Sequence, residues 1–144
     1  MNDCVHRIST RQSLNMNRKP TTRTGIGRIR AAFFYSLNGL RFAISSEAAF
    51  RQEVCIVVVC LLVLLFLPLS IFWKGLLFSA TTSVLVVELL NSAIESVVDI
   101  ASPEYHDLAR RAKDLGSAAV LVSIVLAVVL WGGAVFIILQ GGPK

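Results

Sequence analysis

Residues 84–100 read VLVVELLNSAIESVVDI, an apolar segment that carries three acids and an asparagine. Glu88, Asn91, Glu95 and Asp99 follow one another at spacings of three, four and four residues. In an α-helix, at about 100° per residue, these positions fall within an arc of roughly 80° and form one polar stripe. Acids in hydrocarbon cost about 2.5–3.5 kcal/mol each, so we expect the stripe to face neighbouring helices and to carry a function.

The composition around this stripe is that of a membrane protein. Of the 144 residues, 55% are hydrophobic and only 16% are charged, and the mean hydropathy is +0.70. An average soluble domain carries about a quarter charged residues. We therefore expect an all-α membrane protein with a single membrane domain over residues 26–144. Three uncharged or nearly uncharged stretches predict membrane spans at about residues 48–69, 75–98 and 115–139.

The N-terminal part of the chain differs from the rest. Residues 1–25 are polar and basic, and we expect a disordered arm without a signal peptide. Residues 26–46 combine apolar and basic side chains at helical spacing, which predicts an amphipathic helix at the membrane surface. Gly39 predicts a break in this helix before a second helical piece.

The distribution of basic residues predicts the orientation. Seven of the 14 Lys and Arg residues lie within residues 1–30, where Asp3 is the only acid. By the positive-inside rule, the N-terminus is expected in the cytoplasm and, after three spans, the C-terminus outside it. In a chain this apolar, the basic arm is expected to meet anionic lipid, not nucleic acid. Cys4, Cys55 and Cys60 show no metal or redox spacing.

Polar residues from three segments are expected at the cytoplasmic ends of the helices: the end of the stripe, residues 47–53 and residues 99–114. Carboxylates bind Mg²⁺ through hard oxygen ligands, and basic groups neutralise phosphates, so one interpretation is a metal–nucleotide site. The alternatives are polar contacts between helices for the stripe, a solvated helix face for residues 47–53, and an ordinary cytoplasmic loop for residues 99–114. No G-x-x-x-x-G-K-[ST] phosphate loop is present.

Three motifs resemble those of the small bacterial integral-membrane diacylglycerol kinases. They are Gly39-Leu-Arg with EAAFRQE at residues 47–53, ELLNSAIESVVD at residues 88–99, and EYHDL at residues 104–108 leading into RAKDLGSAAV at residues 111–120. The resemblance runs from about residue 28 to 140. It implies a homotrimer in the bacterial inner membrane, with a periplasmic C-terminus. It also implies transfer of the γ-phosphate of ATP to the hydroxyl of diacylglycerol, with Mg²⁺ as cofactor.

The resemblance further implies roles for individual residues. Glu88 would be the general base, Asn91 would support it, and Asp99 belongs to the same catalytic group. Glu47 and Glu95 would hold the metal ions on ATP. Nucleotide contacts would come from these two acids together with Arg28, Tyr35, Glu104, Tyr105, His106, Lys113 and Asp114. The lipid substrate would lie against Arg28, Ala49, Phe50, Arg51, Gln52, Glu53, Glu88 and Ser117.

Two other functions fit the same residues. An undecaprenol kinase would share the Asn–Glu–Asp stripe, although the EYH and Gly116-Ser117 motifs look closer to the diacylglycerol branch. A non-enzymatic ion-pathway subunit would use the stripe without needing Lys113, Asp114 or Glu47. The chain also departs from the family's pattern. Its arm is roughly twenty residues longer, residues 67–74 match weakly, and Pro103 replaces an ordinary loop residue.

Overall fold

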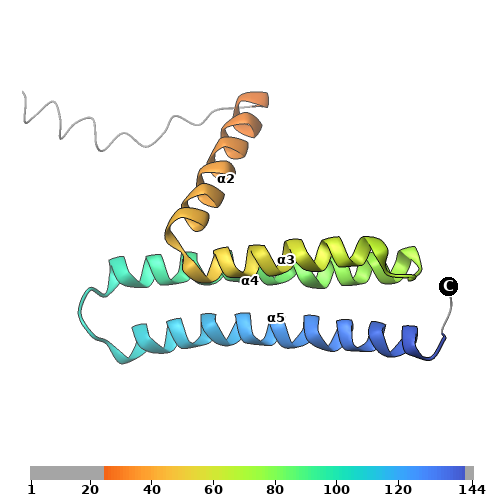
Figure 1. The fold of residues 1–144 in the computed structure, drawn as a ribbon. Coiled ribbons are helices and arrows are strands. Elements are labelled where there is room, and N and C mark those ends of the chain that lie inside the picture. Colours follow the sequence, from red (N-terminus) through yellow and green to blue (C-terminus); the bar gives the residue numbers. More distant parts are fainter. Residues whose placement is uncertain (1–24, 142–144) are drawn as a thin grey trace, which may run out of the picture. The chain divides into compact units, whose positions relative to one another are not determined.

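The computed structural model describes residues 25–141, so the arm predicted at residues 1–25 lies outside the described part except for its last residue. Four α-helices follow one another and are labelled in Figure 1: α2 (Ile26–Ser46), α3 (Ala48–Phe66), α4 (Ile71–Ala101) and α5 (Asp107–Leu139). The predicted all-α class is confirmed. The chain divides into two units, one ending at Gly39 and one beginning at Leu40, and each is described by itself.

The first unit contains the N-terminal turns of α2. Gly25 adopts φ 65°, a left-handed conformation that glycine accepts without steric cost, and its carbonyl accepts from the Arg28 N–H at 3.0 Å. The apolar side chains of Ile29 and Phe33 are exposed, and the guanidinium of Arg30 lies 5.8 Å from the ring centre of Phe34. Apolar and cationic side chains therefore lie along the same turns, and the amphipathic surface helix stays a prediction.

The junction between α2 and α3 lies at Glu47. The predicted break at Gly39 is wrong, because α2 continues to Ser46; glycine inside a helix costs only about 0.5–1 kcal/mol. Glu47 has an extended backbone (φ −99°, ψ 114°), although its N–H still donates to the Ala43 carbonyl at 2.9 Å. The Arg51 guanidinium donates to the carbonyls of residues 44 and 45, both at 3.3 Å, and so satisfies the end of α2.

The turn between α3 and α4 covers residues 67–70, whereas the predicted spans placed it at residues 70–74. α3 ends at Phe66 because Pro68 forces the preceding Leu67 into an extended conformation (φ −70°, ψ 136°). The Ser70 side chain caps α4 by accepting from the Trp73 N–H at 3.5 Å. The Lys74 amine donates to the Leu65 carbonyl at 3.3 Å, which places a cation at the C-terminal end of α3.

The connection between α4 and α5 covers only residues 102–106, whereas the sequence suggested a loop followed by a helix start somewhere within residues 99–114. The charged residues in this stretch do not end the helices. Asp99 lies in the last turns of α4, and Lys113 lies in the second turn of α5. His106 caps α5, since its Nδ1 accepts from the Leu108 N–H at 3.1 Å. A change from apolar to charged residues therefore marks the predicted membrane boundary and not the helix end.

In the second unit, α4 packs against both α3 and α5 (Figure 1). Leu64 of α3, Leu77 of α4 and Ala134 of α5 meet in one buried cluster, together with Leu69 from the α3–α4 turn. A hydrogen bond between two residues that lie 50 positions apart in sequence joins α4 to α5. The Trp131 indole N–H donates to the Thr81 hydroxyl at 2.9 Å. The same hydroxyl donates to the Leu77 carbonyl at 2.7 Å. α4 is thus held on two sides, with one polar contact inside the apolar interface.

Trp131→Phe is expected to lower the free energy of unfolding by about 1 kcal/mol more than a Trp→Phe change at a site without a hydrogen bond between helices. The reason is that it removes the donor to Thr81. Unfolding of the detergent-solubilised protein in SDS measures the change. Trp73→Phe is the matched control, since Trp73 packs against the same apolar cluster. Equal losses for the two variants would mean that the Thr81 contact contributes nothing.

Two of the helices, α3 and α5, are long and apolar enough to cross a membrane. Few of their side chains are buried within the fold, unlike those of a core helix in a soluble protein. Large apolar side chains such as Ile56 and Val125 instead cover the outside of the helices. The chain is an all-α membrane protein. α4 does not reach the same apolarity because it carries the polar stripe, so the span at residues 75–98 stays a prediction.

Candidate functional site

The first part of the polar stripe is buried. Glu88 is 5% exposed and Asn91 is 9% exposed, and both lie on the face of α4 that also buries Thr81 and Val84. Glu95 is half-buried, and Asp99 is exposed near the end of the helix. The stripe therefore runs from the interior of the helix packing to its surface. A buried carboxylate is rare without a partner or a function, which makes Glu88 the centre of the candidate site.

The Asn91 amide is held on both sides. Its Nδ2 donates to Glu95 Oε1 at 3.2 Å, one turn farther along α4. Its Oδ1 is buried and has no hydrogen-bond partner among the residues that the structure describes. Gly116 of α5 lies directly against this oxygen, so that a Cβ added to Gly116 would overlap it. The resemblance assigned Asn91 to the support of Glu88, whereas the hydrogen bond in the structure goes to Glu95.

Further acids belong to the surroundings of Glu88. The negative charges of Glu95 and Glu47 act on the Glu88 carboxylate, and the charge of Glu88 in turn acts on Glu53 of α3. One oxygen of Glu53, Oε2, is buried without a hydrogen-bond partner in the described part of the chain. Carboxylates that share a site repel one another unless a cation or a proton is present. We call Glu47, Glu53, Glu88 and Glu95 the acidic cluster.

This acidic cluster has the donor chemistry for Mg²⁺. Within residues 25–141, no three His, Cys, Asp or Glu side chains are arranged to hold a metal ion by themselves. Mg²⁺ usually takes only one or two carboxylates and completes its shell with substrate phosphates and water. The two acids proposed as ligands, Glu47 and Glu95, therefore fit a metal that arrives with a nucleotide, and they do not fit a closed structural metal site.

Charged pairs follow the acidic cluster at the start of α5. The Lys113 amine lies 2.6 Å from Asp99 Oδ1 and so joins the two helices. Lys113 precedes the predicted span at residues 115–139. Its amine is charged at neutral pH, as is that of an ordinary lysine. Arg110 and Asp114 form a second pair at 3.0 Å within α5. Cationic groups thus lie at the exposed end of the stripe, where phosphates could approach.

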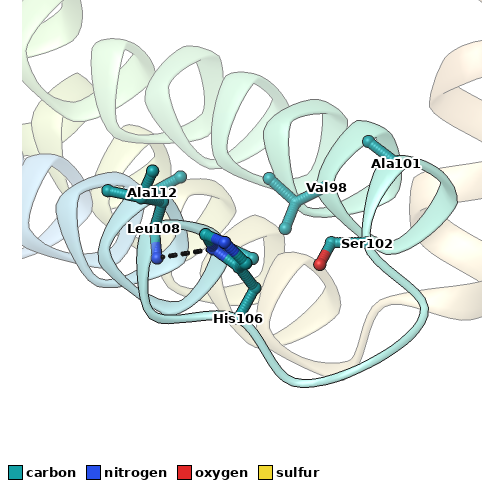
Figure 2. Close-up of a pocket in the computed structure, with 7 residues that line it drawn as sticks. Val98, Ala101, Ser102, His106, Leu108 and Ala112 are labelled. Carbon is teal, nitrogen blue, oxygen red and sulfur yellow. Dashed lines mark hydrogen bonds between the residues drawn. The ribbon is translucent and has the colours of Figure 1, made fainter.

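A hollow lies beside the α4–α5 connection (Figure 2). Its walls are Val98, Ala101 and Ser102 from the end of α4, and His106, Leu108, Ala109 and Ala112 from the start of α5. Figure 2 shows the His106 ring bound to the Leu108 backbone across this connection. Next to it, the Tyr105 hydroxyl donates to Asp107 Oδ1 at 3.0 Å, and Glu104 and Tyr105 are exposed. Three predicted nucleotide contacts therefore sit together on one short turn.

The predicted lipid contacts are spread more widely. Ala49, Arg51 and Gln52 are exposed on the first turns of α3, and the latter two line a shallow hollow with Cys55 and Ile56. Ser117 is exposed on α5, one turn after Lys113. Phe50 is only 2% exposed, so its ring packs inside the fold and leaves little surface for a lipid.

Arg28 and Tyr35 lie in the first unit of the chain and are exposed there. Sequence reasoning missed Gly116 as a neighbour of Asn91. The only available signal was a glycine inside an otherwise regular helical pattern, which points to a close approach without naming the partner.

Comparison with known proteins agrees with the motifs. The family model described as prokaryotic diacylglycerol kinase matches residues 34–136. A diacylglycerol kinase of Escherichia coli K12 is 49% identical over 108 residues, which are 75% of this chain and 88% of that protein. One of Pseudomonas aeruginosa is 45% identical over the same shares of both chains. One of Helicobacter pylori is 39% identical over 113 residues, or 78% of this chain and 88% of the relative.

Proposed function

The chain belongs to the prokaryotic diacylglycerol kinase family and is an ATP-dependent lipid kinase, and from this premise we propose the reaction in detail. It transfers the γ-phosphate of MgATP to the free hydroxyl of diacylglycerol, and the products are phosphatidic acid and ADP. The observation that supports this proposal most strongly is the burial of the Glu88 carboxylate on the same helix face as Asn91. The negative charges of Glu95 and Glu47 act on this carboxylate.

Glu88 acts as the general base. The lipid hydroxyl approaches at the membrane interface, since its acyl chains stay in the bilayer. Its oxygen forms a bond to the γ-phosphorus, the bond between that phosphorus and the bridging oxygen breaks, and ADP leaves. The hydroxyl proton passes to Glu88, which later returns it to water. We propose a direct transfer, because no phosphorylated side chain is needed to balance this step. Asp99 contributes from the exposed end of the stripe, where it holds Lys113.

Glu47 and Glu95 hold the metal. Mg²⁺, when bound with ATP, neutralises charge on the phosphates. Glu95 receives the Asn91 N–H, and that bond supports the proposal by fixing the orientation of one carboxylate oxygen. Glu47 stands at the α2–α3 junction, where its extended backbone separates it from the regular helices. The orphaned Glu53 oxygen adds a further hard acceptor to the same acidic cluster.

The nucleotide is bound by residues at the start of α5 and in the connection before it. Lys113 neutralises phosphate charge. Asp114, which pairs with Arg110, engages the nucleotide as a hydrogen-bond acceptor. Glu104, Tyr105 and His106 contact the nucleoside part from the α4–α5 connection. Arg28 and Tyr35 of the first unit complete the nucleotide contacts.

The lipid headgroup lies along the first turns of α3. Ala49, Arg51 and Gln52 offer an exposed surface there, and the next residue, Glu53, belongs to the acidic cluster. Ser117 contributes from α5 and Arg28 from the first unit. Phe50 does not contact the lipid in this proposal; its buried ring supports the packing of the first turns of α3.

The assembly and location are part of the same proposal. Three spans would place the N-terminus in the cytoplasm and the C-terminus in the periplasm, with the chain in the bacterial inner membrane as a homotrimer. The apolar outer surface of α3 and α5 supports contact with lipid or with further copies of the chain. The strong excess of basic residues before residue 31 supports the orientation.

The substrate is tested by offering diacylglycerol and undecaprenol side by side in mixed micelles with radiolabelled MgATP. We expect transfer to diacylglycerol at a rate at least about tenfold above that to undecaprenol, a discrimination that needs only about 1.4 kcal/mol. Transfer only to undecaprenol would assign the chain to the alternative substrate. Transfer to neither lipid would revive an ion pathway as the role of the polar stripe.

A further inference from the structure

α5 contains three glycines, and only at Gly116 is there no room for a side chain. An added Cβ would overlap Asn91 Oδ1 and would come within 3.3 Å of the amide carbon. Gly132 and Gly133 lie on the same helix with nothing within 4 Å of the equivalent position. Gly116 is also buried, whereas the other two are exposed. Because residue 116 has no side chain, the backbone of α5 can lie directly against the Asn91 amide.

The direction of the Asn91 amide follows from its neighbours. A carboxylate accepts hydrogen bonds only, so the amide must turn its N–H toward Glu95. The oxygen of the same planar group then points away from Glu95 and meets the backbone of Gly116. In that direction glycine presents a Cα hydrogen, which is a weak donor and leaves space for the oxygen. A methyl group there would force the amide to rotate or to withdraw.

We propose that Gly116 is a positioning residue for the kinase reaction: its bare backbone holds the Asn91 amide in the orientation that donates to Glu95. This inference rests on the proposed role of Glu95 as a metal-binding carboxylate. Lys113 lies three residues before Gly116 on α5 and pairs with Asp99 on α4. The two contacts join the same pair of helices, so the helix that supplies Lys113 also orients Glu95 through Asn91.

A double-mutant cycle separates this role from general packing. Gly116→Ala and Asn91→Ala are compared singly and together in the full-length protein. Gly132→Ala is the matched control, since it makes the same change in the same helix where a Cβ has free space. Two quantities are measured: binding of Mn²⁺ together with a non-hydrolysable ATP analogue, followed by electron paramagnetic resonance, and the rate of phosphate transfer. Thermal unfolding reports whether each variant is folded.

Gly116→Ala is expected to weaken Mn²⁺ binding roughly 10- to 100-fold, the usual loss when a group that orients a metal ligand is removed. Asn91→Ala is expected to have a similar effect. In the Asn91→Ala background, Gly116→Ala is expected to change neither Mn²⁺ binding nor the rate by more than about twofold, because the amide it displaces is absent. Gly132→Ala is expected to match the parent protein.

Three results would overturn the inference while leaving the proposed site intact. They are normal Mn²⁺ binding in Gly116→Ala, an equal further loss in the Asn91→Ala background, and a double variant that fails to fold. The last result decides the case even if Gly116→Ala alone does not fold, since removal of the amide makes room for the methyl group. Unchanged Mn²⁺ binding and rate in Asn91→Ala would instead overturn the proposed Asn91–Glu95 assignment and the inference with it.

Discussion

Glu88→Gln is expected to lower kcat roughly 100- to 10,000-fold, the contribution that general base catalysis typically makes. Glutamine has the shape of glutamate but cannot accept the hydroxyl proton. The side chain at residue 88 is only 5% exposed, so water has little access to the site and cannot readily replace the missing base. The KM for MgATP is expected to stay within about threefold of the parent value, because the change does not touch the proposed nucleotide contacts. Radiolabelled phosphate transfer to diacylglycerol in mixed micelles measures both constants.

The same variant is expected to be at least as stable as the parent protein. The charges of Glu95 and Glu47 act unfavourably on the Glu88 carboxylate, and glutamine removes that repulsion. Loss of activity without loss of stability would therefore identify a catalytic role. Ser96→Ala is the control on the same helix, since the Ser96 hydroxyl is exposed and donates to the Ser92 carbonyl at 2.8 Å. Full activity in Glu88→Gln would remove Glu88 from the mechanism.

Lys113→Met is expected to reduce kcat/KM for MgATP roughly 100- to 1,000-fold, comparable to the loss of one preorganised group that stabilises transition-state charge. Methionine keeps most of the length of the side chain and removes its cation. The Lys113 amine lies 2.6 Å from Asp99 at the exposed end of the acidic stripe. It is the residue from α5 that places a positive charge against the carboxylates of α4. Steady-state kinetics with varied MgATP measure the loss.

The unfolding temperature of Lys113→Met shows whether a loss of activity comes from the missing charge or from a damaged fold. The side chains of the pair are 38% and 64% exposed, and an ion pair this accessible to solvent contributes little to stability. The variant is therefore expected to unfold close to the parent temperature. Lys113→Arg is expected to recover only part of the activity, because a planar guanidinium does not reproduce the point charge of the amine. Lys74→Met is the control cation at the other helix connection. An equal loss in Lys74→Met would indicate a general effect of net charge.

The position of the acidic cluster follows from the place of α4 in the fold. α4 packs against both α3 and α5, and residues of both lie by the stripe: Glu53 of α3 and Gly116 of α5. The charge of Glu47 at the α2–α3 junction acts on Glu88, and the charge of Glu88 acts on Glu53 of α3. A cation from α5 meets Asp99. No single helix supplies a site of this kind. The polar stripe therefore stays within an apolar chain because two other helices supply its neighbours.

Sequence reasoning was most successful where one helix is enough. The spacing of Glu88, Asn91, Glu95 and Asp99 predicted a single polar face, and Glu88 and Asn91 are indeed buried on one face of α4. It was less precise at helix ends. A helix start was expected somewhere within residues 99–114, before the span at Leu115, and α5 begins at Asp107, because charged residues can extend a helix beyond the membrane boundary. Hydropathy marks where a side chain leaves lipid, whereas backbone hydrogen bonds and caps such as His106 decide where a helix starts.

Composition, charge and periodicity thus determined by themselves that this chain is an all-α membrane protein with a carboxylate stripe, and its motifs indicated the kinase family. The tertiary structure decided which partners the stripe meets: Gly116 against Asn91, Lys113 against Asp99, and Trp131 against Thr81. The physical reason is that helical periodicity fixes the face on which a residue lies. The register and rotation of one helix against another depend on side-chain packing along the whole interface, which no single segment of sequence contains.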